Sequence, residues 1–249
     1  EVACSIPELA TESNLAARAA RAVLEALQVR RRVRLTLRKN IPAGAGLGGG
    51  SSDAAAVLRA LPGLLGRRLS PGRLRRLAAR LGADVPFFLV GGRAIGVGRG
   101  TELYPLPDCP SRPLLLVYPG LGISTAEAYV RLDQVRGRTR AGPRSPARAL
   151  TAGAAGPMMV GSCGLVDGHR GDRLKNDFEP VVFSAYPELA RLKALLTRSG
   201  ASPALLSGSG SAMFGMFDTA AGARRAAAEV RRRWPRWRIW VTRTVSRRQ

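Results

Sequence analysis

A glycine-rich segment between a predicted strand and a predicted helix constrains this chain more than any other feature of its sequence. Five glycines fall within residues 44–50, inside the segment 42–52. Apolar and polar residues alternate over 33–37, which predicts a strand, and the alanine- and leucine-rich pattern of 53–61 predicts a helix. Glycines let successive amides face one ligand, and a helix start adds free N–H groups and a positive dipole end. We expect a phosphate-binding loop, although a plain glycine-rich turn has the same composition.

Three common phosphate-binding motifs do not fit this segment. Gly44-x-Gly46-x-x-Gly49 matches the dinucleotide pattern, but no acidic residue for the ribose occurs between Asp53 and Asp84. A P-loop needs a lysine before Ser51, where the chain has glycine. The protein-kinase motifs are missing as well. A phosphate-binding loop of another type is therefore predicted.

The segment resembles the Pro-x-x-x-Gly-Leu-Gly-Ser-Ser loop of the GHMP small-molecule kinases, the relatives of galactokinase, homoserine kinase and mevalonate kinase. The run Gly48-Gly49-Gly50-Ser51-Ser52 is similar to one branch of that family, whose substrate is a cytidine-diphosphate-linked methylerythritol. Further stretches agree with this branch, in the same order along the chain: Gly82-Ala83-Asp84-Val85-Pro86-Phe87-Phe88, residues 94–102, Asn176-Asp177-Phe178-Glu179 and Leu206-Ser207-Gly208-Ser209-Gly210-Ser211. The ordered set is more specific than any single motif.

The resemblance implies an α+β fold of two domains with the active site in the cleft between them. Residues 1–111 would form the ATP-binding domain and residues 112–249 the C-terminal domain. The implied activity is ATP- and Mg²⁺-dependent phosphorylation of the substrate's 2-hydroxyl, in the non-mevalonate route to isoprenoid precursors. Two alternatives stay open: a kinase of the homoserine kinase type, and a nucleotide-binding remnant with little activity.

The same resemblance assigns roles to individual positions. Asp84 would be the catalytic carboxylate, and Thr125, Tyr129, Gly208 and Ser209 would contact the substrate or close the site around it. The nucleotide would be bound by Asn14, Lys39, Pro42, Ala43, Gly44, Ala45, Gly46, Leu47, Gly48, Gly49, Gly50, Ser51 and Ser52.

The chemistry of phosphoryl transfer supports a role for Asp84 independently. The reaction needs bound phosphates, a magnesium ion and a carboxylate that takes the hydroxyl proton. Asp84 follows a predicted helix end and precedes the apolar run 85–89, surroundings that suit a base. A helix-capping aspartate would give the same local pattern.

One part of the family pattern is not present in this sequence. Members of the branch open with a strand bearing a lysine that pairs with the catalytic aspartate, followed by a Tyr-His pair that holds the cytosine. Here the lysines are Lys39, Lys175 and Lys193, and the single histidine, His169, lies in the other half. We therefore expect either a fragment of a longer product or a shortened protein.

Further elements follow from periodicity and capping signals. Helices are predicted over 14–27, 71–81, 125–132, 187–199 and 220–233, and strands over 114–117, 204–206, 212–217 and 238–245. Residues 133–172, rich in Gly, Ala, Arg and Pro, are predicted to form a long surface excursion.

Charge and cysteine content narrow the class of protein. The chain has 40 basic and 17 acidic residues, a net charge of +23, and the arginines are scattered without aromatic platforms. This distribution favours a compositional bias over a nucleic-acid partner, although a basic nucleic-acid-binding module is a second class to weigh. Three separated cysteines and the absence of a long apolar run or a secretion signal favour a cytoplasmic protein.

Overall fold

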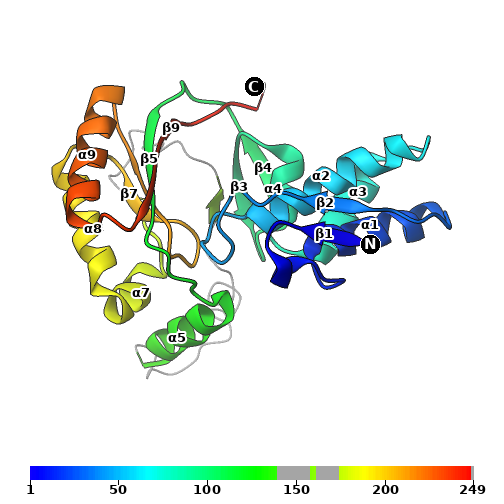
Figure 1. Cartoon of the computed structure of the whole chain (residues 1–249), viewed down its shortest axis with the longest axis horizontal. Helices are drawn as coiled ribbons and strands as arrows, with labels where there is room; N and C mark the ends of the chain where they lie inside the picture. The colour runs from blue at the N-terminus through cyan, green and yellow to red at the C-terminus, as the bar shows by residue number, and fades with distance from the viewer. Residues whose placement is uncertain (139–157, 161–173, 248–249) are drawn as a thin grey trace, which may run out of the picture.

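A computed structural model describes residues 1–138, 158–160 and 174–247 of the chain. Its helices are η1 (Pro7–Leu9), α1 (Leu15–Leu27), α2 (Gly49–Leu64), α3 (Pro71–Leu81), α4 (Val85–Val90), α5 (Thr125–Arg138), α7 (Glu179–Ala185), α8 (Pro187–Arg198) and α9 (Ala220–Arg233). Its strands are β1 (Val2–Cys4), β2 (Leu35–Leu37), β3 (Arg93–Val97), β4 (Glu102–Leu106), β5 (Pro113–Tyr118), β6 (Met158–Val160), β7 (Ala204–Leu206), β8 (Met213–Met216) and β9 (Arg238–Arg243). The predicted α+β class is confirmed, with the helices of the two halves on opposite sides of the molecule (Figure 1).

The first half is built on three packed helices, α1, α2 and α3, of which α1 and α3 begin at capping residues. The Asn14 side chain accepts a hydrogen bond from the Ala16 N–H (2.9 Å), and Ser70 caps α3, which starts with Pro71. The buried faces of these helices carry alanine, valine and leucine, and their core includes the fully buried Val23 and Leu58.

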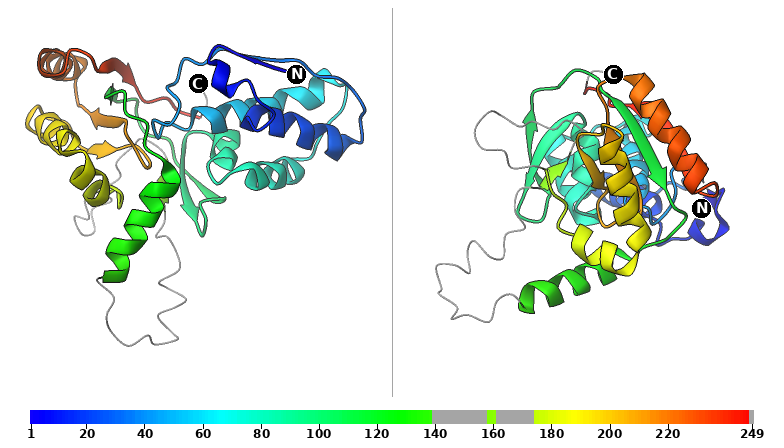
Figure 2. Two further views of the ribbon diagram at one scale, coloured as in Figure 1. Left: turned by 60° about the horizontal axis from the view of Figure 1, so that its bottom comes forward. Right: turned by 90° about the vertical axis from the view of Figure 1, so that its left-hand side faces the viewer.

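The second half is a four-stranded antiparallel sheet in the order β7-β8-β5-β9. Helices α8 and α9 cover one face of this sheet (Figure 1), and Leu115, Leu192 and Phe217 lie in the core between them. Helix α5 packs against α7 at the edge of the second half (Figure 2). The two sheets of the first half are small: β4-β3-β6 is antiparallel and β1-β2 is parallel.

Most predicted elements are present, but three predictions on element bounds are wrong. The helix predicted over 53–61 begins at Gly49 and continues through Pro62 to Leu64. The early start is possible because Gly49 packs under Ile41, where a Cβ would lie 2.9 Å from Ile41 Cγ2. The helix predicted over 125–132 reaches Arg138. Residues 158–160 form a strand that pairs with β3. The end of this helix and this strand both lie within 133–172, the segment predicted to be a surface excursion.

The rest of that excursion, with Cys163 and His169, lies outside the described residues. The predicted domain boundary falls in the connection between β4 and β5, while β6, from the later portion, pairs with β3. Within the described ranges, no helix is long and apolar enough to cross a membrane.

Two leucines of α2 that differ in burial allow a test of the hydrophobic core of the first half. Leu58 is fully buried, whereas Leu64, on the same helix, is 82% exposed. We expect Leu58→Ala to lower the free energy of unfolding by about 2–5 kcal/mol, because it removes buried methyl groups and leaves a cavity. Leu64→Ala is the control and is expected to change it by less than about 0.5 kcal/mol. Urea unfolding measures both, and equal losses would contradict the assigned core.

Candidate active site

The glycine-rich loop lies against the second half of the chain and is held there through its carbonyl groups. The Ser207 hydroxyl donates to the Gly46 carbonyl (2.8 Å), and the Ala212 N–H donates to the Ala45 carbonyl (3.0 Å). A longer bond joins the Ile123 N–H to the Gly44 carbonyl (3.4 Å). Three consecutive carbonyls of the loop therefore face the second half.

The amide groups of the same loop are free. No acceptor in the described ranges takes a hydrogen bond from the N–H of any residue from Gly44 to Ser51. The first three residues of α2 belong to this run, and their N–H groups carry the positive end of the helix dipole. Free, neighbouring N–H groups at a helix start are a binding site for phosphate oxygens. The loop predicted from the glycines thus has the donors that its chemistry needs.

Side-chain packing explains why glycine stands at two positions of the loop. Gly46 has a φ of +74°, and a Cβ there would overlap the Ser207 carbonyl oxygen of the second half. Gly48 precedes α2 with a φ of +67°, and a Cβ there would lie 2.7 Å from Cζ of Phe88 in α4. Only a residue without a side chain fits these contacts in a left-handed conformation.

Lys39 lies beside the start of α2 and Asn14 at the start of α1, and both side chains are already engaged. Lys39 Nζ pairs with Asp53 at 2.5 Å, and its side chain is only 7% exposed. A Cβ on Gly49 would lie 3.7 Å from Lys39 Nζ. The Asn14 amide caps α1 and donates to the Leu9 carbonyl (2.8 Å). Their predicted contacts with a nucleotide stay predictions.

Asp84 occupies the position before α4, yet its side chain caps nothing. The backbone there is helical, and the carboxylate makes no capping hydrogen bond. The capping interpretation of Asp84 is therefore wrong. Although the residue reaches solvent, partial burial raises the pKa of the Asp84 carboxyl above its ordinary value. Four residues on, Phe88 contacts Gly48, so α4 joins Asp84 to the end of the glycine-rich loop.

The residues predicted on the substrate side meet around the 207–211 turn. Thr125, at the start of α5, has its hydroxyl 2.9 Å from that of Ser209. A Cβ on Gly208 would lie 3.3 Å from the Gly46 carbonyl oxygen, so the turn touches the loop directly. One turn along α5, Tyr129 is 52% exposed and packs edge-to-face on Phe178, with ring centroids 4.9 Å apart.

Three residues that shape this region had no predicted role. The Asn176 amide donates to the Leu206 and Gly208 carbonyls (2.9 and 2.8 Å) and so holds the turn. Ser207 and Phe88 contact the loop as described above. The Asn176-Asp177-Phe178-Glu179 motif was the available signal for Asn176; no sequence pattern indicates contacts between residues so far apart along the chain.

The two glycines at the front of the loop make a matched pair for mutation. Both have positive φ, but the nearest atom to a Cβ on Gly44 is 3.9 Å away, whereas one on Gly46 meets backbone of the second half. We expect Gly44→Ala to cost about 1–2 kcal/mol of unfolding free energy from backbone strain alone. Gly46→Ala should cost about 1–3 kcal/mol more, because the loops must separate.

Denaturant unfolding and ATP titration of both variants check this expectation. ATP affinity should fall further for Gly46→Ala, since the displaced loop no longer presents its amides together. Equal effects at the two positions would show that the loop contact does not organise the site.

The raised pKa of Asp84 has a consequence for stability. Because the folded-state pKa lies above the unfolded one, ionisation of Asp84 costs stability as the pH rises above 3.8. Asp84→Asn removes that cost, so the variant should be more stable than the parent chain near about pH 7, and the difference should narrow as the pH falls toward 3.8. Urea unfolding over this range measures the difference. Asp133→Asn, at an exposed position of α5, is the control. A gain in stability for Asp84→Asn that does not change with pH would contradict the raised pKa of Asp84.

Comparisons with known proteins place this geometry in a family. Residues 14–92 match the GHMP kinases N terminal domain and residues 152–236 match GHMP kinases C terminal. A 4-diphosphocytidyl-2-C-methyl-D-erythritol kinase of Solibacter usitatus is 47% identical over 82% of this chain and 62% of its own length. One of Desulfitobacterium hafniense is 39% identical over 99% of this chain and 80% of its own length.

Solved structures of GHMP kinases have the same fold as this chain. A crystal structure of 4-(cytidine 5'-diphospho)-2C-methyl-D-erythritol kinase has a TM-score of 0.71 at 37% identity, covering 99% of this chain and 83% of that one. A homoserine kinase from Cytophaga hutchinsonii has a TM-score of 0.68 over 99% of this chain and 81% of that one, but its 17% identity shows a shared fold only. From its two family domains and these relatives, the chain belongs to the GHMP kinases, and within them to the 4-diphosphocytidyl-2-C-methyl-D-erythritol kinases.

Proposed function

We propose that this chain transfers the γ-phosphoryl group of ATP to the 2-hydroxyl of 4-diphosphocytidyl-2-C-methyl-D-erythritol, a step in isoprenoid precursor synthesis. The relatives named above support the substrate. The observation that carries the proposal is the run of free N–H groups from Gly44 to Ser51 at the start of α2. Such a run binds the phosphates of ATP and leaves the terminal phosphoryl group open to attack.

Phosphoryl transfer depends mainly on positioning and on neutralising charge. The loop amides and the dipole of α2 would stabilise the negative charge on the transferred group. Because the loop is bonded to Ser207 and Ala212, the donors are already in place before ATP binds. A preorganised set of donors needs little rearrangement in the transition state.

Asp84 would accept the proton of the attacking hydroxyl. A general base is most effective when its pKa lies close to the working pH, and partial burial moves the pKa of Asp84 upward, in that direction. Its carboxylate is not used for capping. The contact of Phe88 with Gly48 would keep the base in register with the phosphates.

The site residues fit a magnesium ion that enters with the nucleotide. Within residues 1–138, 158–160 and 174–247, no cluster of three or more histidine, cysteine or acidic residues could hold a metal alone. Mg²⁺ in phosphoryl-transfer sites is bound mostly by phosphates and water, with one or two protein oxygens. The Ser51 hydroxyl, at the start of α2, is the protein oxygen that would complete its shell. When bound, the ion would neutralise phosphate charge.

The cytidine end of the substrate would lie along α5. Tyr129 offers a half-exposed ring that is braced by Phe178, and the Thr125 and Ser209 hydroxyls form a polar pair beside it. Aromatic rings stack on nucleobases, and hydroxyls bind their polar edges. The arrangement accounts for a substrate that carries a base at one end.

Replacing the proposed base tests the mechanism. Asp84→Asn is expected to lower kcat by about 10²–10⁴-fold, the usual contribution of a general base, with little change in ATP affinity. Steady-state ADP release and a separate ATP titration measure the two quantities. Asp133→Asn on the exposed face of α5 is the control. Retention of full kcat by Asp84→Asn would remove Asp84 from the mechanism.

Substrate choice is tested by coupled ADP release with Mg²⁺-ATP. The chain is incubated in parallel with 4-diphosphocytidyl-2-C-methyl-D-erythritol and with homoserine. We expect release with the first substrate only. Release with homoserine alone, or with neither while ATP still binds, would overturn the proposed reaction.

A further inference from the structure

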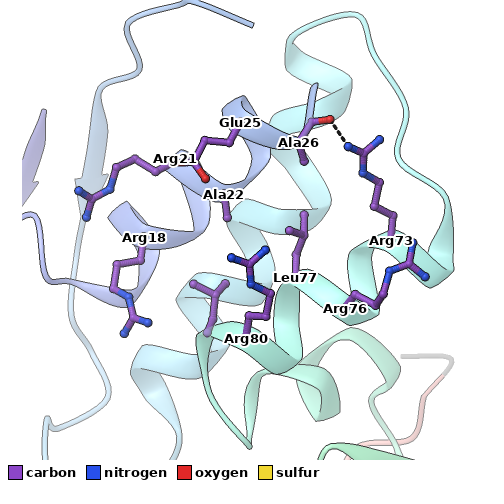
Figure 3. Close-up of a pocket in the computed structure, with 10 residues that line it drawn as sticks. Arg18, Arg21, Ala22, Glu25, Ala26, Arg73, Arg76, Leu77 and Arg80 are labelled. Atoms are coloured by element: carbon purple, nitrogen blue, oxygen red, sulfur yellow. Dashed lines mark hydrogen bonds between the residues drawn. The ribbon is translucent and has the colours of Figure 1, made fainter. Parts of the chain in front are cut away.

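A groove between α1 and α3 collects arginines outside the proposed active site. It has a volume of about 620 Å³, and its guanidinium groups come from both helices (Figure 3). Its lining residues are Arg18, Arg21, Ala22, Glu25, Ala26, Arg73, Arg76, Leu77, Arg80 and Leu81. None of these residues belongs to the glycine-rich loop or to the 207–211 turn.

The charges of this groove are poorly balanced within the protein. Five arginines line it against the single acid Glu25, and no ion pair in the described ranges joins Glu25 to any of them. The side chains of Arg18, Arg76 and Arg80 have no hydrogen-bond or ion-pair partner among the described residues. Five positive side chains along one groove repel one another and attract a ligand of opposite charge.

Among the described residues, some surface arginines outside the groove pair with acids, whereas others, such as Arg224 and Arg231, do not. Arg34 pairs with Glu1 and Arg112 with Asp218, while Arg232 and Arg233 share Glu229. Within the groove, Arg73 donates to the Ala26 carbonyl (2.5 Å), which ties α3 to the end of α1 and fixes the width of the groove. The arginines of the two helices therefore line one groove whose walls are tied together at Arg73.

We propose that this groove binds a small anion containing a chain of two or more phosphate groups. Its volume lies within the range of about 300–1,000 Å³ that is usual for small-molecule sites. Guanidinium groups bind phosphate oxygens in pairs, and several phosphates are needed to engage arginines on both helices. The floor contains the apolar Ala22 and Leu77, and a low-dielectric floor strengthens charge-assisted hydrogen bonds above it.

The groove lies between two helices whose ends adjoin Asn14 and Asp84, so a ligand bound there would affect the stability of this half of the chain. Helix α1 starts directly after Asn14, and α3 ends at Leu81, three residues before Asp84. An anion that bridges the two helices would hold them together and would raise the temperature at which the chain unfolds. Binding does not require the proposed kinase activity, so its test is independent of that assignment.

Isothermal titration of the full chain with inorganic tripolyphosphate, at about 150 mM salt to screen weak surface attraction, tests the site. We expect saturable binding that is about tenfold or more weaker in the double variant Arg76→Gln/Arg80→Gln, because charge-assisted hydrogen bonds are lost. The control Arg224→Gln/Arg231→Gln removes the same charge from the exposed face of α9 and should bind like the parent chain. Arg18→Gln, on the opposite wall, is a second variant and should weaken binding on its own.

Unchanged binding in Arg76→Gln/Arg80→Gln and in Arg18→Gln would overturn the proposal, since the anion would then bind elsewhere. Equal weakening in the α9 control would overturn it too, because the attraction would be a general effect of net charge. Orthophosphate is expected to bind at least about tenfold more weakly than tripolyphosphate, since it engages fewer arginines. A parallel ATP titration distinguishes the source of the phosphates: a second ATP site, lost in Arg76→Gln/Arg80→Gln, would extend the ligand class to nucleotides.

Discussion

The site depends on hydrogen bonds that run from the second half of the chain to the glycine-rich loop. Ser207, Ala212 and Ile123 donate to three consecutive loop carbonyls. A backbone whose carbonyls are satisfied on one side can present its amides on another without leaving buried acceptors unpaired. The free N–H groups that would bind phosphate are therefore a consequence of the contact between the halves, and Gly46 permits the approach because it has no side chain.

Asp84 illustrates how a candidate base differs from an ordinary helix-start aspartate. A capping carboxylate exchanges water for backbone N–H groups, and those hydrogen bonds favour its charged form. Asp84 has lost part of its hydration without gaining a capping bond, so its pKa rises. Ionisation of such a group reduces stability at neutral pH, and groups with shifted pKa values are common at functional sites. The same α4 helix carries Phe88 onto Gly48, so the candidate base and the glycine-rich loop share one structural support.

The arginine surplus separates into two populations once the chain is folded. Some arginines are neutralised by nearby acids at the surface, and such pairs contribute little to stability. Those between α1 and α3 line one groove, in which Glu25 is the single acid among the lining residues. Composition gives one number, +23, for both populations. A net charge cannot distinguish them, because convergence is a property of helix packing.

By itself, the sequence determined the family, the α+β class, most helices and the place of the glycine-rich loop, because caps, periodicity and glycine runs act over a few neighbouring residues. It did not indicate that α2 would begin at Gly49, because the packing of Ile41 on that glycine comes from tertiary structure. Nor did it distinguish a capping Asp84 from a desolvated one. Only the tertiary structure showed that Ser207 bonds to Gly46, because these two residues are 161 positions apart. It alone also showed that Asn176 holds the 207–211 turn, 30 or more positions along the chain. Local sequence patterns predict helices, strands and turns, because these depend on neighbouring residues. A site between two halves depends on the packing of residues that are far apart in the sequence.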